Sequence, residues 1–160
     1  MAATLVASGC SGPPPGGLED YQKKILSGEQ ALKEQGATLK QRTFAMNQTA
    51  WSVDLSGKEI KPEMFEALQK LEAVGELILK ESKITDDQLQ SLAKLSPLYI
   101  INLSNTGITD SGMKHLTQNS ISELDVTGTR VTADAVTALR KRYSTDPGIN
   151  PFFRNIKIKH

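Results

Sequence analysis

A repeated spacing of apolar residues between Trp51 and Tyr143 constrains this chain more than any other feature of its sequence. Four aliphatic markers follow one another at intervals of 24, 24 and 23 residues, at Ile60, Ile84, Ile108 and Val131. Apolar residues recur seven and five positions before each marker, and again five and eight positions after it. Such agreement across four copies is the signature of a repeat architecture, in which each copy is one structural unit.

The spacing within each copy predicts a strand, a turn and a helix. The pair before each marker alternates apolar with polar, which is the period of a strand, whereas the pair after it is three residues apart on one helical face. Thr85, Thr109 and Thr132 follow three of the markers and can cap a starting helix, and acidic residues near them suit its positive end. Pro62 fits the first helical position of the first copy. Four stacked copies would share a continuous core under a parallel sheet.

The segments Glu76–Asp86 and Ile101–Asp110 resemble the cysteine-containing class of leucine-rich repeats, which is common in bacterial surface lipoproteins and in F-box adaptors. Ser82, Thr106 and Thr129 occupy the position that gives this class its name. The resemblance covers about residues 51–143. It implies an α/β right-handed solenoid with a parallel sheet on the concave face and helices on the convex face, used for ligand binding or as a scaffold.

The flanking segments have the composition of caps. Residues 18–50 predict helix followed by a short strand, with Gly28 breaking the helix in two and Gly36 ending it. Residues 38–44 and 49–55 are expected to pair as a hairpin that protects the first repeat, with Trp51 pointing inward. In the C-terminal capping segment, 144–160, alternation around Ile156 predicts a fifth parallel strand beside residues 124–126. The side chain of Phe152 or Phe153 should cover the end of the core.

The first seventeen residues differ from the rest, because they are rich in proline and glycine and carry no charge. We expect a flexible leader that acts as a tether. Residues 5–10 resemble a bacterial lipobox, which implies acylation of Cys10. Ala7 departs from the usual leucine, and the segment before Cys10 is too short for an export signal, so a truncated or misassigned start is expected. The alternative is a tail whose single thiol has no role.

Composition and motif content argue against several function classes. The net charge is +1, which does not favour nucleic-acid binding, and no apolar stretch approaches the roughly 18 residues that span a bilayer. A single cysteine and two distant histidines, His115 and His160, predict neither a disulfide nor a metal site. Hydrolase, nucleotide-loop and metalloprotease motifs are absent from the sequence, and Ser104 and Asp125 have no histidine near them. We therefore expect no catalytic residues and no cofactor.

The repeat phase predicts a binding surface on the concave sheet face, where strand residues point away from the core. Ile78 and Ile100 form an apolar centre on neighbouring strands, within a border that is mostly acidic or small and polar. The predicted partner-binding residues are Asp54, Glu76, Ile78, Lys80, Ile100, Asn102, Ser104, Glu123, Asp125 and Thr127. The alternative is a solvated sheet face with two scattered isoleucines.

A second candidate surface is basic, since the segment from Arg140 to His160 carries six basic residues against one acid, Asp146. Basic residues at a helix C-terminus stabilise its dipole, and anionic lipid headgroups are the functional alternative. The sequence thus predicts a monomeric, non-enzymatic interaction module that is lipid-anchored in a bacterial envelope through Cys10 and binds a protein partner. The alternative is a cytoplasmic adaptor or effector without an anchor.

Overall fold

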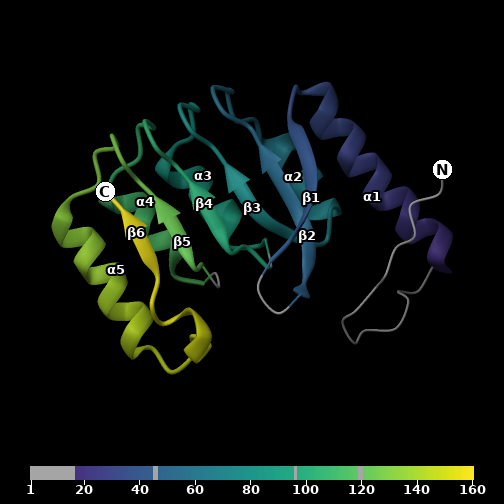
Figure 1. Cartoon of the computed structure of the whole chain (residues 1–160). Coiled ribbons are helices and arrows are strands. Elements are labelled where there is room, and N and C mark those ends of the chain that lie inside the picture. The colour runs from purple at the N-terminus through teal and green to yellow at the C-terminus, as the bar shows by residue number, and fades with distance from the viewer. Residues whose placement is uncertain (1–16, 45–46, 96, 119–120) are drawn as a thin grey trace.

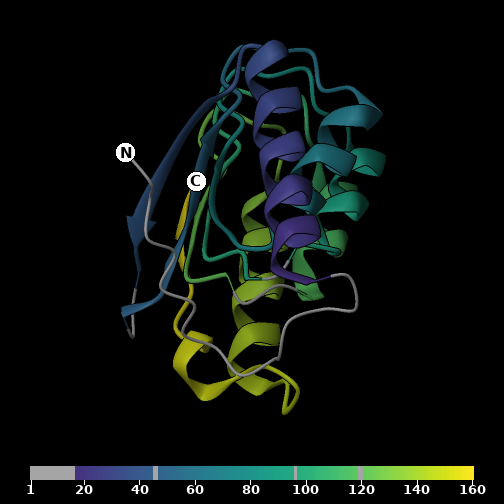
Figure 2. The same ribbon diagram turned by 90° about the vertical axis from the view of Figure 1, so that its right-hand side faces the viewer.

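A computed structural model describes residues 17–44, 47–95, 97–118 and 121–160. Within these ranges the chain forms two layers, a sheet and a set of helices that cover one of its faces (Figure 1; Figure 2). The strands follow one another across the sheet in sequence order, β1-β2-β3-β4-β5-β6. They span β1 Thr38–Thr43, β2 Thr49–Asp54, β3 Val74–Ile78, β4 Ile100–Asn102, β5 Glu123–Asp125 and β6 Lys157–Lys159.

The helices are unequal in length. The helical elements are α1 Gly17–Glu34, α2 Pro62–Lys70, α3 Asp86–Leu92, α4 Asp110–Met113 with the 3-10 helix η2 Lys114–Gln118, α5 Ala133–Thr145 and the 3-10 helix η3 Pro151–Phe153. We refer to β2 with α2, β3 with α3, β4 with α4 and β5 with α5 as the four units. None of the helices in the described ranges is long and apolar enough to cross a membrane.

The expected right-handed leucine-rich-repeat solenoid with a parallel sheet is wrong. The described residues form an α/β fold with one six-stranded sheet and five α-helices. The sheet is mixed, because β1 pairs antiparallel with β2 while the remaining pairs are parallel. The helices of the four units contain nine, seven, four and thirteen residues, so the units are not equivalent. The repeat spacing specifies a strand, a turn and a helix in each unit. The flanking segments add one strand at each edge of the sheet, β1 antiparallel to β2 and β6 parallel to β5.

The core lies between the sheet and the helices. The alternating apolar pairs of β2 to β5 are at most 1% exposed, and the register places Val53, Leu77, Ile101 and Leu124 side by side across the sheet. The predicted inward positions of these strands are therefore confirmed. The intervening side chains face the opposite surface of the sheet, which no helix of the described residues covers (Figure 2).

Threonine and aspartate link consecutive units at the helix starts. Thr85, Thr109 and Thr132 accept hydrogen bonds from the first-turn amides of their own helices, which confirms the predicted caps. The Asp86 carboxylate also accepts two hydrogen bonds from Thr109 of the next unit, one from the Thr109 amide at 2.8 Å and one from the Thr109 hydroxyl at 2.5 Å. Asp110 does the same with Thr132, at 2.7 and 2.8 Å. The aspartates thus connect neighbouring units, beyond any effect on the helix dipole.

The N-terminal segment confirms the hairpin and contradicts the predicted helix break. Residues 38–43 pair antiparallel with 49–54, and the half-buried Trp51 packs against the core. Helix α1 runs unbroken through Gly28. A β-carbon on Gly28 would lie 2.8 Å from the carbonyl oxygen of Ala67 and 2.7 Å from the β-carbon of Lys70. Gly28 therefore permits close packing of α1 on α2, and its missing side chain does not end the helix.

The C-terminal segment forms the predicted fifth parallel strand. β6 pairs with β5, and its register places Ile158 beside Leu124. Ile156 and Ile158 are buried, and Phe153 covers the core with an exposed fraction of 7%. Arg140 of α5 donates to the carbonyl oxygen of Ile158 at 2.9 Å, which fixes the strand to the last helix.

Candidate functional site

The uncovered surface of the sheet, which we call the open face, collects the predicted binding residues. Their side chains alternate with the buried ones along β2 to β5, and parallel pairing aligns them in two rows across the strands. One row is Ser52, Glu76, Ile100, Glu123 and Lys157, and the next is Asp54, Ile78, Asn102, Asp125 and Lys159. Ile78 and Ile100 are half-buried and lie diagonally, because Ile100 pairs with Glu76 and Ile78 pairs with Asn102.

Polar side chains at the strand ends stabilise the following turns. At three strand ends a side-chain Oδ1 atom accepts a hydrogen bond from the backbone amide of the residue two positions ahead. The lengths are 2.9 Å at Asp54, 2.9 Å at Asn102 and 3.0 Å at Asp125. Such Asx turns reverse the chain locally with a side-chain oxygen in place of a backbone acceptor. Ser104 is buried, and its hydroxyl donates to Asn102 at 2.7 Å, so it is less accessible than predicted. Thr127 and Lys80 are exposed beyond the strand ends, where Lys80 pairs with Glu81 at 3.4 Å.

Glu76 is held inside a small polar network and is not a freely accessible acid. It is 8% exposed, and its carboxylate accepts hydrogen bonds from the Arg42 guanidinium and, at 2.5 Å, from the Ser52 hydroxyl. A buried carboxylate needs such partners, since desolvation of an unpaired charge is costly. At the other side of the face Lys159 lies 3.2 Å from Glu123. Two of the predicted acidic contacts are therefore already paired within the chain.

A row of aromatic rings that the sequence patterns do not predict lies near the starts of the strands. Phe44 and Tyr99 have ring centroids 5.6 Å apart, and Tyr99 stacks on Phe153 with centroids 5.7 Å apart. The Arg42 guanidinium lies over Phe44 at 5.8 Å and also binds Glu76, so Phe44 adjoins the open face. Tyr99 and Phe153 pack against the core. A β-carbon on Gly75 would lie 2.5 Å from the Phe44 ring, which shows how closely this ring covers β3.

The half-buried Tyr99 adds a polar group to the aromatic row. Its hydroxyl hydrogen-bonds to the Gln48 side chain, and burial raises the pKa of Tyr99 above its ordinary value. In this bond the phenol is the donor and the Gln48 amide oxygen is the acceptor.

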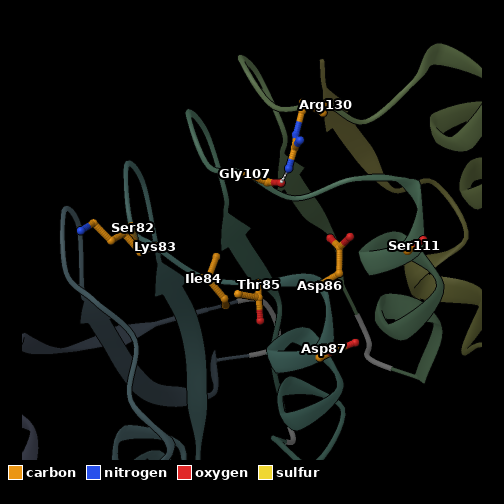
Figure 3. A pocket seen from close by; sticks show the side chains of 9 residues that line it. All are labelled: Ser82, Lys83, Ile84, Thr85, Asp86, Asp87, Gly107, Ser111 and Arg130. Carbon is orange, nitrogen blue, oxygen red and sulfur yellow. Dashed lines mark hydrogen bonds between the residues drawn. The ribbon is translucent and has the colours of Figure 1, made fainter.

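A depression of about 610 Å³ lies at the turns that follow the strands, and Figure 3 shows its lining. The Asp86 carboxylate is bonded to Thr109, and Arg130 donates to the carbonyl oxygen of Gly107 at 2.8 Å. The Lys83 side chain extends away from both (Figure 3). The depression does not bring a nucleophile, a base and an oxyanion donor together, which acyl-transfer chemistry would need. The described residues also contain no group of three or more histidine, cysteine or acidic side chains that could hold a metal ion.

The basic residues of the C-terminal segment are spread over α5 and β6. Arg140 bonds the β6 backbone, Arg142 lies 3.6 Å from Asp146, and Lys159 pairs with Glu123. His160 bonds the carbonyl oxygen of Val131 at 2.7 Å, and His115 is half-buried in η2. These contacts give much of the basic charge a structural role, and the lipid-headgroup interpretation stays a prediction. Cys10 lies outside the described residues, so its acylation also stays a prediction.

No known protein-family model matches the sequence, and no significant match is found among curated proteins. The interpretation of the open face therefore depends on its own geometry.

Proposed function

We propose that this chain is a non-enzymatic interaction module that binds a protein partner on the open face of its sheet. One observation carries the proposal. A sheet face that the helix layer leaves uncovered combines the half-buried apolar side chains of Ile78 and Ile100 with a polar border. Apolar and aromatic side chains at the centre of a surface and polar ones at its rim are typical of protein interfaces.

The engagement of the acidic groups also favours binding over catalysis. Glu76, Asp86 and Asp110 each accept hydrogen bonds that connect elements of the fold. A general acid or base must be free to exchange a proton with a substrate. Carboxylates that stabilise turns and neighbouring units serve the scaffold that presents the open face.

Photo-crosslinking tests the site directly. A photoreactive amino acid at position 100 should give a discrete adduct in cells, whereas the same group at Glu66, exposed on α2, should not. Mass spectrometry of the adduct identifies the partner, and its binding is then measured with purified proteins. Ile78→Asp combined with Ile100→Asp should abolish binding while the circular dichroism spectrum stays unchanged, because both side chains lie outside the core. If the partner still binds the doubly substituted chain, the open face is not the binding site.

For location we propose attachment to a bacterial envelope through acylated Cys10, with an unanchored cytoplasmic adaptor or effector as the alternative. The small residues before Cys10 and the proline- and glycine-rich segment after it support this proposal. Metabolic labelling with a palmitate analogue, performed on the full-length gene, separates the two. Only the anchored form predicts label that disappears in Cys10→Ser.

A further inference from the structure

Two carboxylates on the open face are left without a cationic partner among the described residues. Glu76 is bound by Arg42, and Glu123 is paired with Lys159. With the residues that the structure describes, Asp54 and Asp125 form no salt bridge, and each uses only its Oδ1 atom in the turn that follows its strand. Lys159 is the register neighbour of Asp125, yet its ammonium group lies 3.2 Å from Glu123. The charges of Asp54 and Asp125 are therefore available to a binding partner.

The turns do not explain why these two residues are charged. Asn102 occupies the same row in β4, and its Oδ1 atom accepts the Ser104 amide at 2.9 Å. This bond has the same length as the one that Asp54 accepts from the amide of Ser56. A neutral amide oxygen thus suffices for the turn, as expected for a motif that needs only an acceptor. The negative charge of Asp54 and Asp125 has no role in the turn itself.

The two carboxylates lie at opposite sides of the apolar centre. Asp54 is on β2 and Asp125 on β5, so three strand spacings separate them, about 14 Å. Ile78 and Asn102 lie between them in the same row, and Ile100 lies in the adjacent row. This arrangement is an apolar patch with one unpaired negative charge on each flank.

We infer that the open face binds a basic, amphipathic segment of a protein partner. Aliphatic side chains of that segment contact Ile78 and Ile100, and basic side chains about 14 Å apart approach Asp54 and Asp125. The inference rests on the proposed function, because it specifies the partner of the same surface. Two stacked open faces would bring four unpaired carboxylates together, which disfavours a second copy of this chain.

The experiment is a selection of peptides on the intact chain. A phage-displayed random peptide library is selected on the immobilised protein, with counter-selection on the Ile78→Asp, Ile100→Asp variant. Enriched peptides are synthesised, and their dissociation constants are measured against the parent chain and against Asp54→Asn combined with Asp125→Asn. Asparagine keeps the turn acceptor, as Asn102 illustrates, and thermal melting checks that the variant is folded. Asp20→Asn combined with Asp134→Asn removes the same charge from exposed helix positions and is the matched control.

The expected peptides carry Lys or Arg on both sides of aliphatic residues. Their affinity should fall about tenfold on Asp54→Asn with Asp125→Asn, stay unchanged in the control, and weaken between low and physiological ionic strength. Peptides that require Ile78 and Ile100 but lack basic residues, or that bind the asparagine variant equally well, overturn the basic partner and leave the proposed function standing. If no peptide binds the parent chain better than it binds the Ile78→Asp, Ile100→Asp variant, both the proposed function and this inference are wrong.

Discussion

The four units and the N-terminal segment contribute to the same core by different means. In the units, two alternating aliphatic side chains of each strand are almost fully buried, and the pattern recurs from β2 to β5. Helix α1 leaves Leu18 and Leu26 more than 60% exposed and packs on α2 through the close approach at Gly28. A periodic pattern therefore specifies burial within a unit, whereas the contact between α1 and α2 depends on a single residue, Gly28.

The largest effect should come from removing the C-terminal end of the core. Deletion of residues 151–160 removes β6 together with the buried side chains of Phe153, Ile156 and Ile158. We expect a loss on the order of 5 kcal/mol, because each large apolar side chain contributes roughly 1.5 to 3 kcal/mol on burial. The deletion also exposes the unpaired edge of β5 and should promote self-association. Thermal melting and light scattering check both effects, and a truncated chain as stable and monomeric as the parent contradicts them.

A substitution inside one unit should cost less than that deletion and more than one in the hairpin. Leu103→Ala empties a fully buried position of the third unit and should lower the free energy of unfolding by about 2 to 5 kcal/mol. Leu39→Ala in β1 is the comparison, because Leu39 is only half-buried and should cost about 1 kcal/mol. Denaturant unfolding curves measure both. Equal losses would mean that the hairpin and the units are packed equally well.

The sequence predicts which side chains of the four units are buried. It does not predict the contacts between segments that are far apart in the sequence. The period of the aliphatic pairs correctly places Leu77 and Leu103 in the core, and threonine chemistry correctly predicts the helix starts. Alternation likewise predicts β6 beside β5. In each case the information is local, because side-chain direction follows from position along a strand or helix.

The missed features depend on contacts between residues that are far apart in the sequence. Phe44 meets Tyr99 only after the hairpin and two further strands, β3 and β4, are assembled, so no local pattern marks the pair. A glycine within a helical sequence can either break the helix or let a second helix pack closely against it. For Gly28 only the packing of α1 on α2 decides between these two roles. The uniform spacing of the markers also does not predict that the helices differ in length, from four residues in α4 to thirteen in α5. These unequal helices and the antiparallel pairing of β1 with β2 distinguish the fold from a regular solenoid.

The close approach of α1 to α2 gives a third, intermediate prediction. Gly28→Ala introduces a methyl group within 3 Å of the Ala67 carbonyl oxygen, so the helices must separate. We expect a loss of about 1 to 3 kcal/mol, although alanine favours helix formation when no neighbour interferes. Ser27→Ala on the exposed side of α1 is the control and should change stability by less than about 0.5 kcal/mol. A more stable Gly28→Ala variant would show that α1 does not pack closely on α2.

The smallest predicted effect concerns the link between the last two units. Hydrogen bonds from the amide and the hydroxyl of Thr132 lower the pKa of Asp110 below its ordinary value of 3.8. A group whose pKa is lowered on folding stabilises the folded state above its unfolded pKa, and this contribution disappears as the pH falls through the folded value. The melting temperature should therefore decrease as the pH is lowered from about 5 to about 3, and the decrease should be smaller in Asp110→Asn. Asp134→Asn keeps the Thr132 contacts and should follow the parent chain, since Asp134 is exposed on α5. An identical pH profile for Asp110→Asn and the parent would mean that Thr132 holds the carboxylate too weakly to couple these units.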